Sequence, residues 1–271
     1  MKQQNGKHLP LFSRAGTSLL AASCVFATTV SNASADPNAC KDLPTYDALK
    51  SALIAARHHT DDKGKSDNGG FDLDMWGTVV NRDGIVCAVA FTGNDRGDQW
   101  PGSRVISAQK ANTANAFSLP KLALSTANLY TAVQPGGSLF GLQESNPVDT
   151  EVAYGGNAKN YGKPNDPMVG KKIGGINVFG GGLGLYNNSG DLIGGLGVSG
   201  DSSCADHNIA WRTRDTLGLD FVPAGVSGDS LRKDNIVYIG STNPQAAAWG
   251  QPHCLDATTE QSIADNLPTN N

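Results

Sequence analysis

The residues best suited to chemistry lie around a glycine-rich segment, 194–202, that reads GGLGVSGDS. Gly195, Gly197 and Gly200 have the G-x-G-x-x-G spacing of a dinucleotide-binding loop, between a predicted strand and a predicted helix. A nucleotide site of this kind also needs a second parallel strand after the helix, ending in an acid for the ribose. Residues 219–223 are too short and too close to a proline to form that strand. We therefore expect these glycines to permit the close approach of a helix, another subunit or a flat ligand.

His207 is the histidine best placed to bind a metal, because it follows the glycine segment near the start of a predicted helix. A surface or helix-capping histidine is the alternative that the sequence leaves open. His58 and His59 end the first predicted helix, but neighbours on a helix point about 100° apart and make poor joint ligands. His253 lies beside Cys254 in the C-terminal tail.

Four further side chains are candidates for holding an acidic ligand. Lys110 and Thr113 stand three residues apart on one face of a predicted helix, where they could contact an acid group or a metal. The alternative is a solvated lysine and a threonine that bonds to its own helix backbone. Arg96 and Arg104 flank Trp100 and could bind carboxylates in a fork, although single arginines in loops are usually just solvated.

The elements that must position these residues follow from hydrophobic periodicity and turn residues. Turn sequences at 81–84 and 187–190 each join two β-rich runs, so each pair of runs is expected to form an antiparallel hairpin. The order helix, hairpin, two helices, hairpin, helix predicts an α+β domain with an antiparallel sheet. The expected helices are 44–59, 104–117, 122–133 and 203–217, and the expected strands are 75–80, 85–91, 180–186 and 191–198.

The first 35 residues have the features of a secretory signal peptide. Lys2, Lys7 and Arg14 precede a short apolar run, and Ala33-Ser34-Ala35 is an A-x-A cleavage pattern. The run is too short and too rich in Ser and Thr for a membrane anchor, and no later stretch is apolar enough to span a bilayer. We expect cleavage near Ala35 and a periplasmic or secreted protein.

Composition narrows the class of partner. Acidic residues outnumber basic ones by 25 to 21, with a formal net charge of −4, which disfavours nucleic acid and anionic membranes as partners. Glycine accounts for 33 of 271 residues, well above the usual ~7%, and indicates a loop-rich globular domain.

Four cysteines lie beyond the predicted cleavage site, and an even number in an exported protein indicates two disulfides. Three pairings are possible. A Cys40–Cys254 bridge would tie both ends of the chain to the domain, and it leaves Cys87–Cys204, so we favour this pairing. No Cys-x-x-Cys or clustered Cys/His pair indicates a structural metal.

Several of these segments together resemble the GlcG/HbpS-like heme-binding family, also described as a haem-degrading domain. The resemblance spans about 44–222 and is carried by SAQKANTA at 107–114, by the Asp83-Gly84 turn, by GGI at 174–176, and most strongly by GDLIGGLGVSG at 190–200. The 143–172 segment is longer than the usual connection in that family.

The resemblance implies a profilin- or PAS-like antiparallel sheet flanked by helices, assembled into homo-oligomers, with heme as the small-molecule ligand. It places a domain at 36–222 with an insertion at 143–172. Residues 223–271 lie beyond the resemblance, and we expect them to form an irregular C-terminal extension packed on the domain. The residues then expected to contact heme are His207, also as the metal ligand, with Thr113, Lys110, Arg104, Arg96, Gly195 and Gly197.

Two other functions stay open at this stage. One is an enzyme that degrades heme or acts on a small organic acid, and the other is a non-catalytic sensory or interaction module. The sequence contains no G-x-S-x-G and no H-E-x-x-H, so hydrolysis has no motif to support it.

Overall fold

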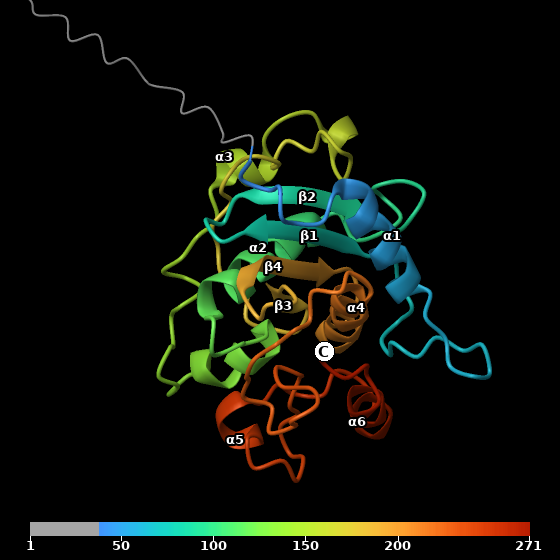
Figure 1. Ribbon diagram of the computed structural model, residues 1–271, viewed down its shortest axis with the longest axis vertical. Coiled ribbons are helices and arrows are strands. Elements are labelled where there is room, and N and C mark those ends of the chain that lie inside the picture. The colour runs from blue at the N-terminus through green and yellow to red at the C-terminus, as the bar shows by residue number, and fades with distance from the viewer. Residues whose placement is uncertain (1–37) are drawn as a thin grey trace, which may run out of the picture. The chain divides into compact units, whose positions relative to one another are not determined.

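A four-stranded antiparallel sheet is the centre of the structure, a computed structural model that describes residues 38–271 (Figure 1). Its strand order is β2-β1-β4-β3, so the two predicted hairpins lie side by side and are joined by β1 and β4. The strands are β1 (Trp76–Asn81), β2 (Val86–Phe91), β3 (Gly182–Tyr186) and β4 (Leu192–Ser199). The predicted fold class, an antiparallel sheet with flanking helices, is confirmed. The predicted leader, 1–35, lies outside the described residues.

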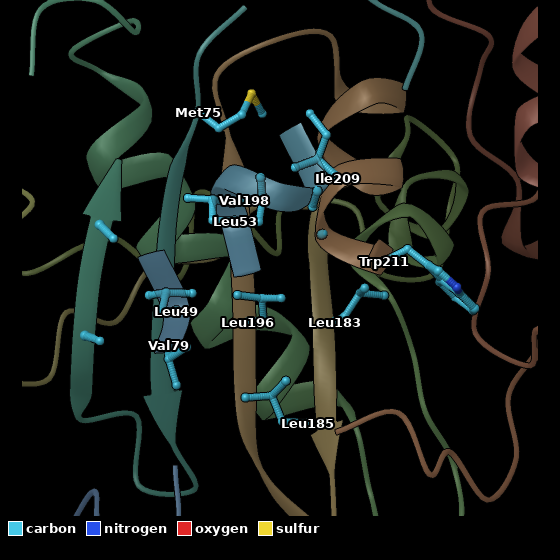
Figure 2. Close-up of a cluster of buried hydrophobic side chains, with 14 of the residues drawn as sticks. Leu49, Leu53, Met75, Val79, Leu183, Leu185, Leu196, Val198, Ile209 and Trp211 are labelled. Atoms are coloured by element: carbon cyan, nitrogen blue, oxygen red, sulfur yellow. The ribbon is translucent and has the colours of Figure 1, made fainter. Parts of the chain in front are cut away.

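Helices cover both faces of this sheet. The first helix, α1 (Tyr46–Arg57), begins at Thr45, whose hydroxyl accepts a hydrogen bond from the amide of Ala48. It packs with α4 (Ser203–Thr216) on one face, and α2 (Ser103–Phe117) packs on the opposite face. Figure 2 shows the core between the sheet and α1 and α4, where leucine, valine and isoleucine side chains meet Met75 and Trp211. Because both faces are covered, the strands are buried along nearly their whole length.

The glycines of β4 lie directly beneath α2. A Cβ atom at Gly195 would overlap the carbonyl oxygen of Ala111, and one at Gly197 would overlap the carbonyl oxygen of Ser107. Glycine in a strand weakens it but lets another backbone approach closely. The element that packs against these glycines is therefore a helix of the same chain.

We expect Gly197→Ala to lower the free energy of unfolding by about 1–3 kcal/mol, because α2 must shift to admit the methyl group. Gly102→Ala is the matched control, since a Cβ there would meet nothing within 4 Å and its φ of −64° suits alanine. Urea unfolding of both variants measures the difference. Equal stability of the two would contradict the close helix–strand contact.

The predicted helix at 122–133 is wrong. Two short 3₁₀ turns stand there, Thr126–Leu129 and Thr131–Val133. Side chains in this stretch bond elsewhere, which competes with a regular helix: Thr126 donates to the Phe179 carbonyl and Thr131 to the Gly250 carbonyl. These two hydrogen bonds hold the segment against Phe179 and against the C-terminal extension at Gly250.

The 143–172 segment lies along the outer edge of β2. It contains α3 (Thr150–Tyr154) and a 3₁₀ turn, Ala158–Asn160. The Val86 amide donates to the Lys171 carbonyl, and the Gly170 amide donates to the Val86 carbonyl, each at 2.9 Å. These bonds satisfy backbone groups that an open sheet edge would leave free.

The C-terminal extension, 223–271, contains α5 (Ala246–Trp249) and α6 (Ala257–Asp265). Figure 1 shows it, in orange and red, on the β3 side of the sheet beside α4. A buried ion pair fixes it there: Arg214 of α4 donates to Asp234 at 2.6 and 2.8 Å and to the Gly184 carbonyl of β3 at 3.1 Å. Across residues 38–271, no helix is both long and apolar enough to cross a membrane.

The four cysteines within residues 38–271 form two disulfides, but the favoured pairing is wrong. The bonds are Cys40–Cys87 and Cys204–Cys254. The chain near Cys40 lies at the β1–β2 hairpin, where Asn81 donates to the Ala39 carbonyl, so Cys40 meets β2. The extension returns to the start of α4, so Cys254 meets Cys204. Each end of the described chain is tied to a different part of the domain.

Candidate functional site

The glycine-rich turn between β4 and α4 is held by a buried ion pair. Lys110 of α2 donates to Asp206 of α4 at 2.6 Å and to the Val198 carbonyl at 3.2 Å. The other oxygen of Asp206 accepts the amides of Gly200 and Asp201. Burial raises the pKa of Asp206 to about 6, and burial lowers the pKa of Lys110, with each partner partly offsetting the cost for the other. The carboxylate thus orders the turn that joins β4 to α4.

His207 is sealed beside this pair by the C-terminal extension. Its Nε2 lies 3.1 Å from Asn235 Oδ1 and 3.1 Å from the amide of Ile236, and its side chain has no exposed area. Its Nδ1 has no hydrogen-bond partner within the described residues. Desolvation lowers the pKa of His207 to about 4, so the ring is neutral at pH 7.

This pKa predicts an acid-sensitive contribution to stability. The ring binds a proton at about pH 6.5 when unfolded and only at about pH 4 when folded, so protons favour the unfolded state between these values. Asp206 has the opposite sign, because its raised pKa favours the folded state as pH falls. We therefore expect the stability advantage of the unaltered chain over His207→Gln to shrink by about 2 kcal/mol from pH 7 to pH 4.5. Urea unfolding at both pH values measures it, and a constant difference would contradict the low pKa.

The other predicted contact residues also have partners in the fold. Thr113 donates to the Gln109 carbonyl at 2.7 Å and accepts the Asn177 amide at 2.9 Å. Arg104 is buried, pairs with Asp166 through two nitrogens and lies 3.7 Å from the centre of the Tyr161 ring. Arg96 is half exposed on the 92–102 loop, 3.9 Å from Asp95.

The structure thus brings some of the predicted residues together and separates others. Lys110 approaches Gly181 and His207 approaches the neighbouring Gly180, whereas Gly197 lies beneath α2 at Ser107. Thr113 lies one turn farther along α2. Arg104 faces the 143–172 segment, and Arg96 lies on the exposed 92–102 loop beside Asp95. The roles expected for these residues in heme contact stay predictions.

A second imidazole, His253, has the surroundings of a ligand side chain. Its Nδ1 lies 3.0 Å from Glu260 Oε2, and its ring stacks on that of Tyr238 with centroids 4.0 Å apart. Glu260 is buried and also accepts the amides of Cys254 and Leu255. In the neutral tautomer that donates from Nδ1 to this carboxylate, Nε2 keeps its lone pair.

Two hollows meet at the His253 ring. The larger, of about 710 Å³, lies within the extension between residues 235–244 and α6. The smaller, of about 330 Å³, is lined by Tyr130, Phe179, Ser203, Gln251, Pro252, His253 and Cys254. His207 lines neither hollow.

From the sequence, His253 was placed only in the C-terminal tail beside Cys254, with no role as a ligand. The neighbouring Cys254 could have indicated a role for His253, because the Cys204–Cys254 disulfide brings residue 253 to the first turn of α4. The disulfide pairing favoured from the sequence placed Cys254 beside Cys40 instead, and so hid this juxtaposition.

The fold and its buried polar centre define a class of α+β domain in which two hairpins form one sheet and a helix lies on glycines of the central strand. Residues 72–214 match the family described as haem degrading protein HbpS-like, which includes all four strands, α2 and most of α4. The chain belongs to this HbpS-like family. The match ends before the extension that carries His253 and Glu260.

Solved structures with a similar fold include a PduOC:heme complex at 22% identity, with a TM-score of 0.42, covering 63% of this chain and 89% of that one. The Klebsiella pneumoniae protein ORFY is 25% identical, with a TM-score of 0.41, and covers 64% of this chain and 90% of its own. HbpS is 18% identical, with a TM-score of 0.38, and covers 65% of this chain and 90% of its own. No curated protein matches the chain.

Proposed function

We propose that this chain is an exported protein that binds heme or a similar flat tetrapyrrole. The observation that carries the proposal is the match of residues 72–214 to a family described by haem degradation, because a protein that acts on haem must first bind it. Export is supported by the leader-like sequence of residues 1–35 and by the two disulfides, which persist in oxidising compartments. We also expect a homo-oligomer, which sedimentation velocity tests.

Four of the residues first expected to contact heme are occupied by other parts of the chain in this structure. The Nε2 of His207 is engaged by the extension, Lys110 is neutralised by Asp206, and α2 fills the space above Gly195 and Gly197. Heme supplies an iron that takes one or two axial donors and two propionates that need water or cations. An imidazole with a free nitrogen beside an open hollow is one source of such a donor. His253 lines such a hollow, and its contact with Glu260 is made through Nδ1.

Titration of the purified chain, without residues 1–35, with hemin tests the proposal. We expect a saturable Soret shift with a stoichiometry near one heme per chain. An unsaturable, linear increase in absorbance, as given by hemin in buffer, would overturn heme binding. The spectrum of protein isolated from its native compartment provides a second readout.

The same complex distinguishes binding from turnover. If the chain degrades heme, a reductant with oxygen should bleach the Soret band and release iron that a chelator detects. A stable Soret band under these conditions favours binding alone. Cell fractionation with and without residues 1–35 tests export, and retention of the full chain in the cytoplasm would overturn that part.

A further inference from the structure

The imidazole of His253 is the feature of the extension that combines a free nitrogen with an open hollow. Glu260 is only 2% exposed and accepts hydrogen bonds from His253 Nδ1 and from two backbone amides, so it cannot turn away from the ring. Tyr238 stacks on the ring at an interplanar angle of 15°, which limits its rotation. Metal-binding histidines commonly donate their other ring nitrogen to a carboxylate, which fixes the tautomer and raises the basicity of the donor.

No hydrogen bond to His253 Nε2 is present within residues 38–271, and the side chain is 22% exposed. This atom therefore needs no protein partner to be displaced before it can donate to a metal. His207 differs in this respect, because ligation through its Nε2 would break the contact with the Ile236 amide.

The charges lining the two hollows decide which one suits heme. The larger is lined by Asp229 and Asp265, with no lysine or arginine, and two carboxylates disfavour the propionates of heme. The smaller has no carboxylate in its lining and presents the rings of Tyr130 and Phe179 beside Pro252. Aromatic and apolar walls with few polar groups are typical of cofactor sites.

The size of the smaller hollow, about 330 Å³, is at the lower end of the ~300–1,000 Å³ usual for ligand sites. A hollow of this size would cover a porphyrin only in part, which would leave its propionates in water with no need for a buried cation. This is consistent with the absence of lysine and arginine from the lining.

We infer that His253, positioned by Glu260, is an axial donor for heme bound at the hollow lined by Tyr130, Phe179 and Pro252. This inference rests on the proposed function. The donor lies in the extension, outside the residues that match the family, so the ligand comes from a part of the chain that the family model does not include.

The test compares His253→Ala with His59→Ala. His59 is the matched control because its Nδ1 also lies near a carboxylate, 2.7 Å from Asp67 Oδ1, while its ring lines neither hollow. We expect His253→Ala to weaken hemin binding at least ten-fold and to remove the histidine signature from the magnetic circular dichroism spectrum. Free imidazole should restore that signature, and His59→Ala should behave as the unaltered chain does. A His253→Gln variant, which can still donate to Glu260, separates loss of the ligand from loss of folding.

The outcomes separate the inference from the proposed function. If the unaltered chain binds heme and His253→Ala and His253→Gln bind it with the same affinity and spectrum, the assignment of His253 is overturned and heme binding stands. If the unaltered chain shows no saturable binding, the proposed function fails and the assignment fails with it.

A second pair of variants tests which hollow is used. Tyr130→Ala removes an aromatic wall of the smaller hollow, and Thr258→Ala changes the lining of the larger one. We expect the dissociation constant for hemin to rise about five-fold in the first variant and to stay unchanged in the second. The reverse result would overturn the choice of hollow.

Discussion

Replacing Asp206 by alanine is expected to lower the free energy of unfolding by about 3–5 kcal/mol, because it leaves the ammonium of Lys110 buried without its counter-ion. The cost has a second part. Asp206 also accepts the amides of Gly200 and Asp201, so alanine leaves two buried donors unpaired at the β4–α4 turn. Chemical denaturation at pH 7 measures the loss.

Asp206→Asn separates the two contributions. Its amide oxygen can still accept the amides of Gly200 and Asp201, but it cannot neutralise Lys110. We expect Asp206→Asn to be destabilising and the double variant with Lys110→Met to recover much of the loss, since a buried pair replaced as a whole costs far less than one broken in half. A double variant as unstable as Asp206→Asn alone would contradict this account of the pair.

The same pair shows why part of the site was hidden in the sequence. Lys110 and Asp206 are separated by 96 residues, and their contact depends on the pairing of β1 with β4, which no local pattern encodes. Local signals did predict the hairpins, because the turns at 81–84 and 187–190 fix which strands pair first. The sequence therefore predicted both halves of the sheet but not the groups that meet between them.

For the glycines of β4, the sequence predicted a close contact but not the element that makes it. Their presence in a strand predicted that something approaches closely, and the structure identifies it as α2. The sequence did not distinguish a helix, a subunit and a ligand as the contacting group, because a glycine in a strand allows close approach by any of them. The contact surface of α2 is rich in alanine, at positions 108, 111 and 114. These small residues in the sequence were the indication that α2 is the helix that packs on the glycines.

The disulfide pairing and the surroundings of His253 were not predicted from the sequence. Even cysteine number correctly implied two bonds, yet the pairing depends on where the ends of the chain return. The path of the extension is set by contacts such as Asn128 with the Asn235 carbonyl and Gln251 with the Gly180 amide. These are single side-chain bonds to the backbone of distant loops, and they have no periodic pattern that a sequence could reveal.

Replacing Asp234 by alanine is expected to cost about 3–5 kcal/mol and to loosen the extension, because Arg214 is fully buried and would lose both of its bonds to this carboxylate. The change acts next to Asn235 and Ile236, the two residues that contact His207 Nε2. Loss of the ion pair should therefore expose His207, with faster amide exchange at Ile236 and an earlier proteolytic cut within 223–271.

Arg96→Ala is the matched control for this ion pair. Arg96 is half exposed and lies 3.9 Å from its partner Asp95, so its loss should change stability by no more than about 0.5 kcal/mol. If Asp234→Ala instead leaves exchange at Ile236 as slow as in the unaltered chain, the extension is held mainly by its other contacts, including the Cys204–Cys254 bond. Hemin titration of Asp234→Ala then shows whether the extension contributes to the site. Weaker binding than in the unaltered chain indicates a ligand from the extension such as His253, and tighter binding indicates the newly accessible His207.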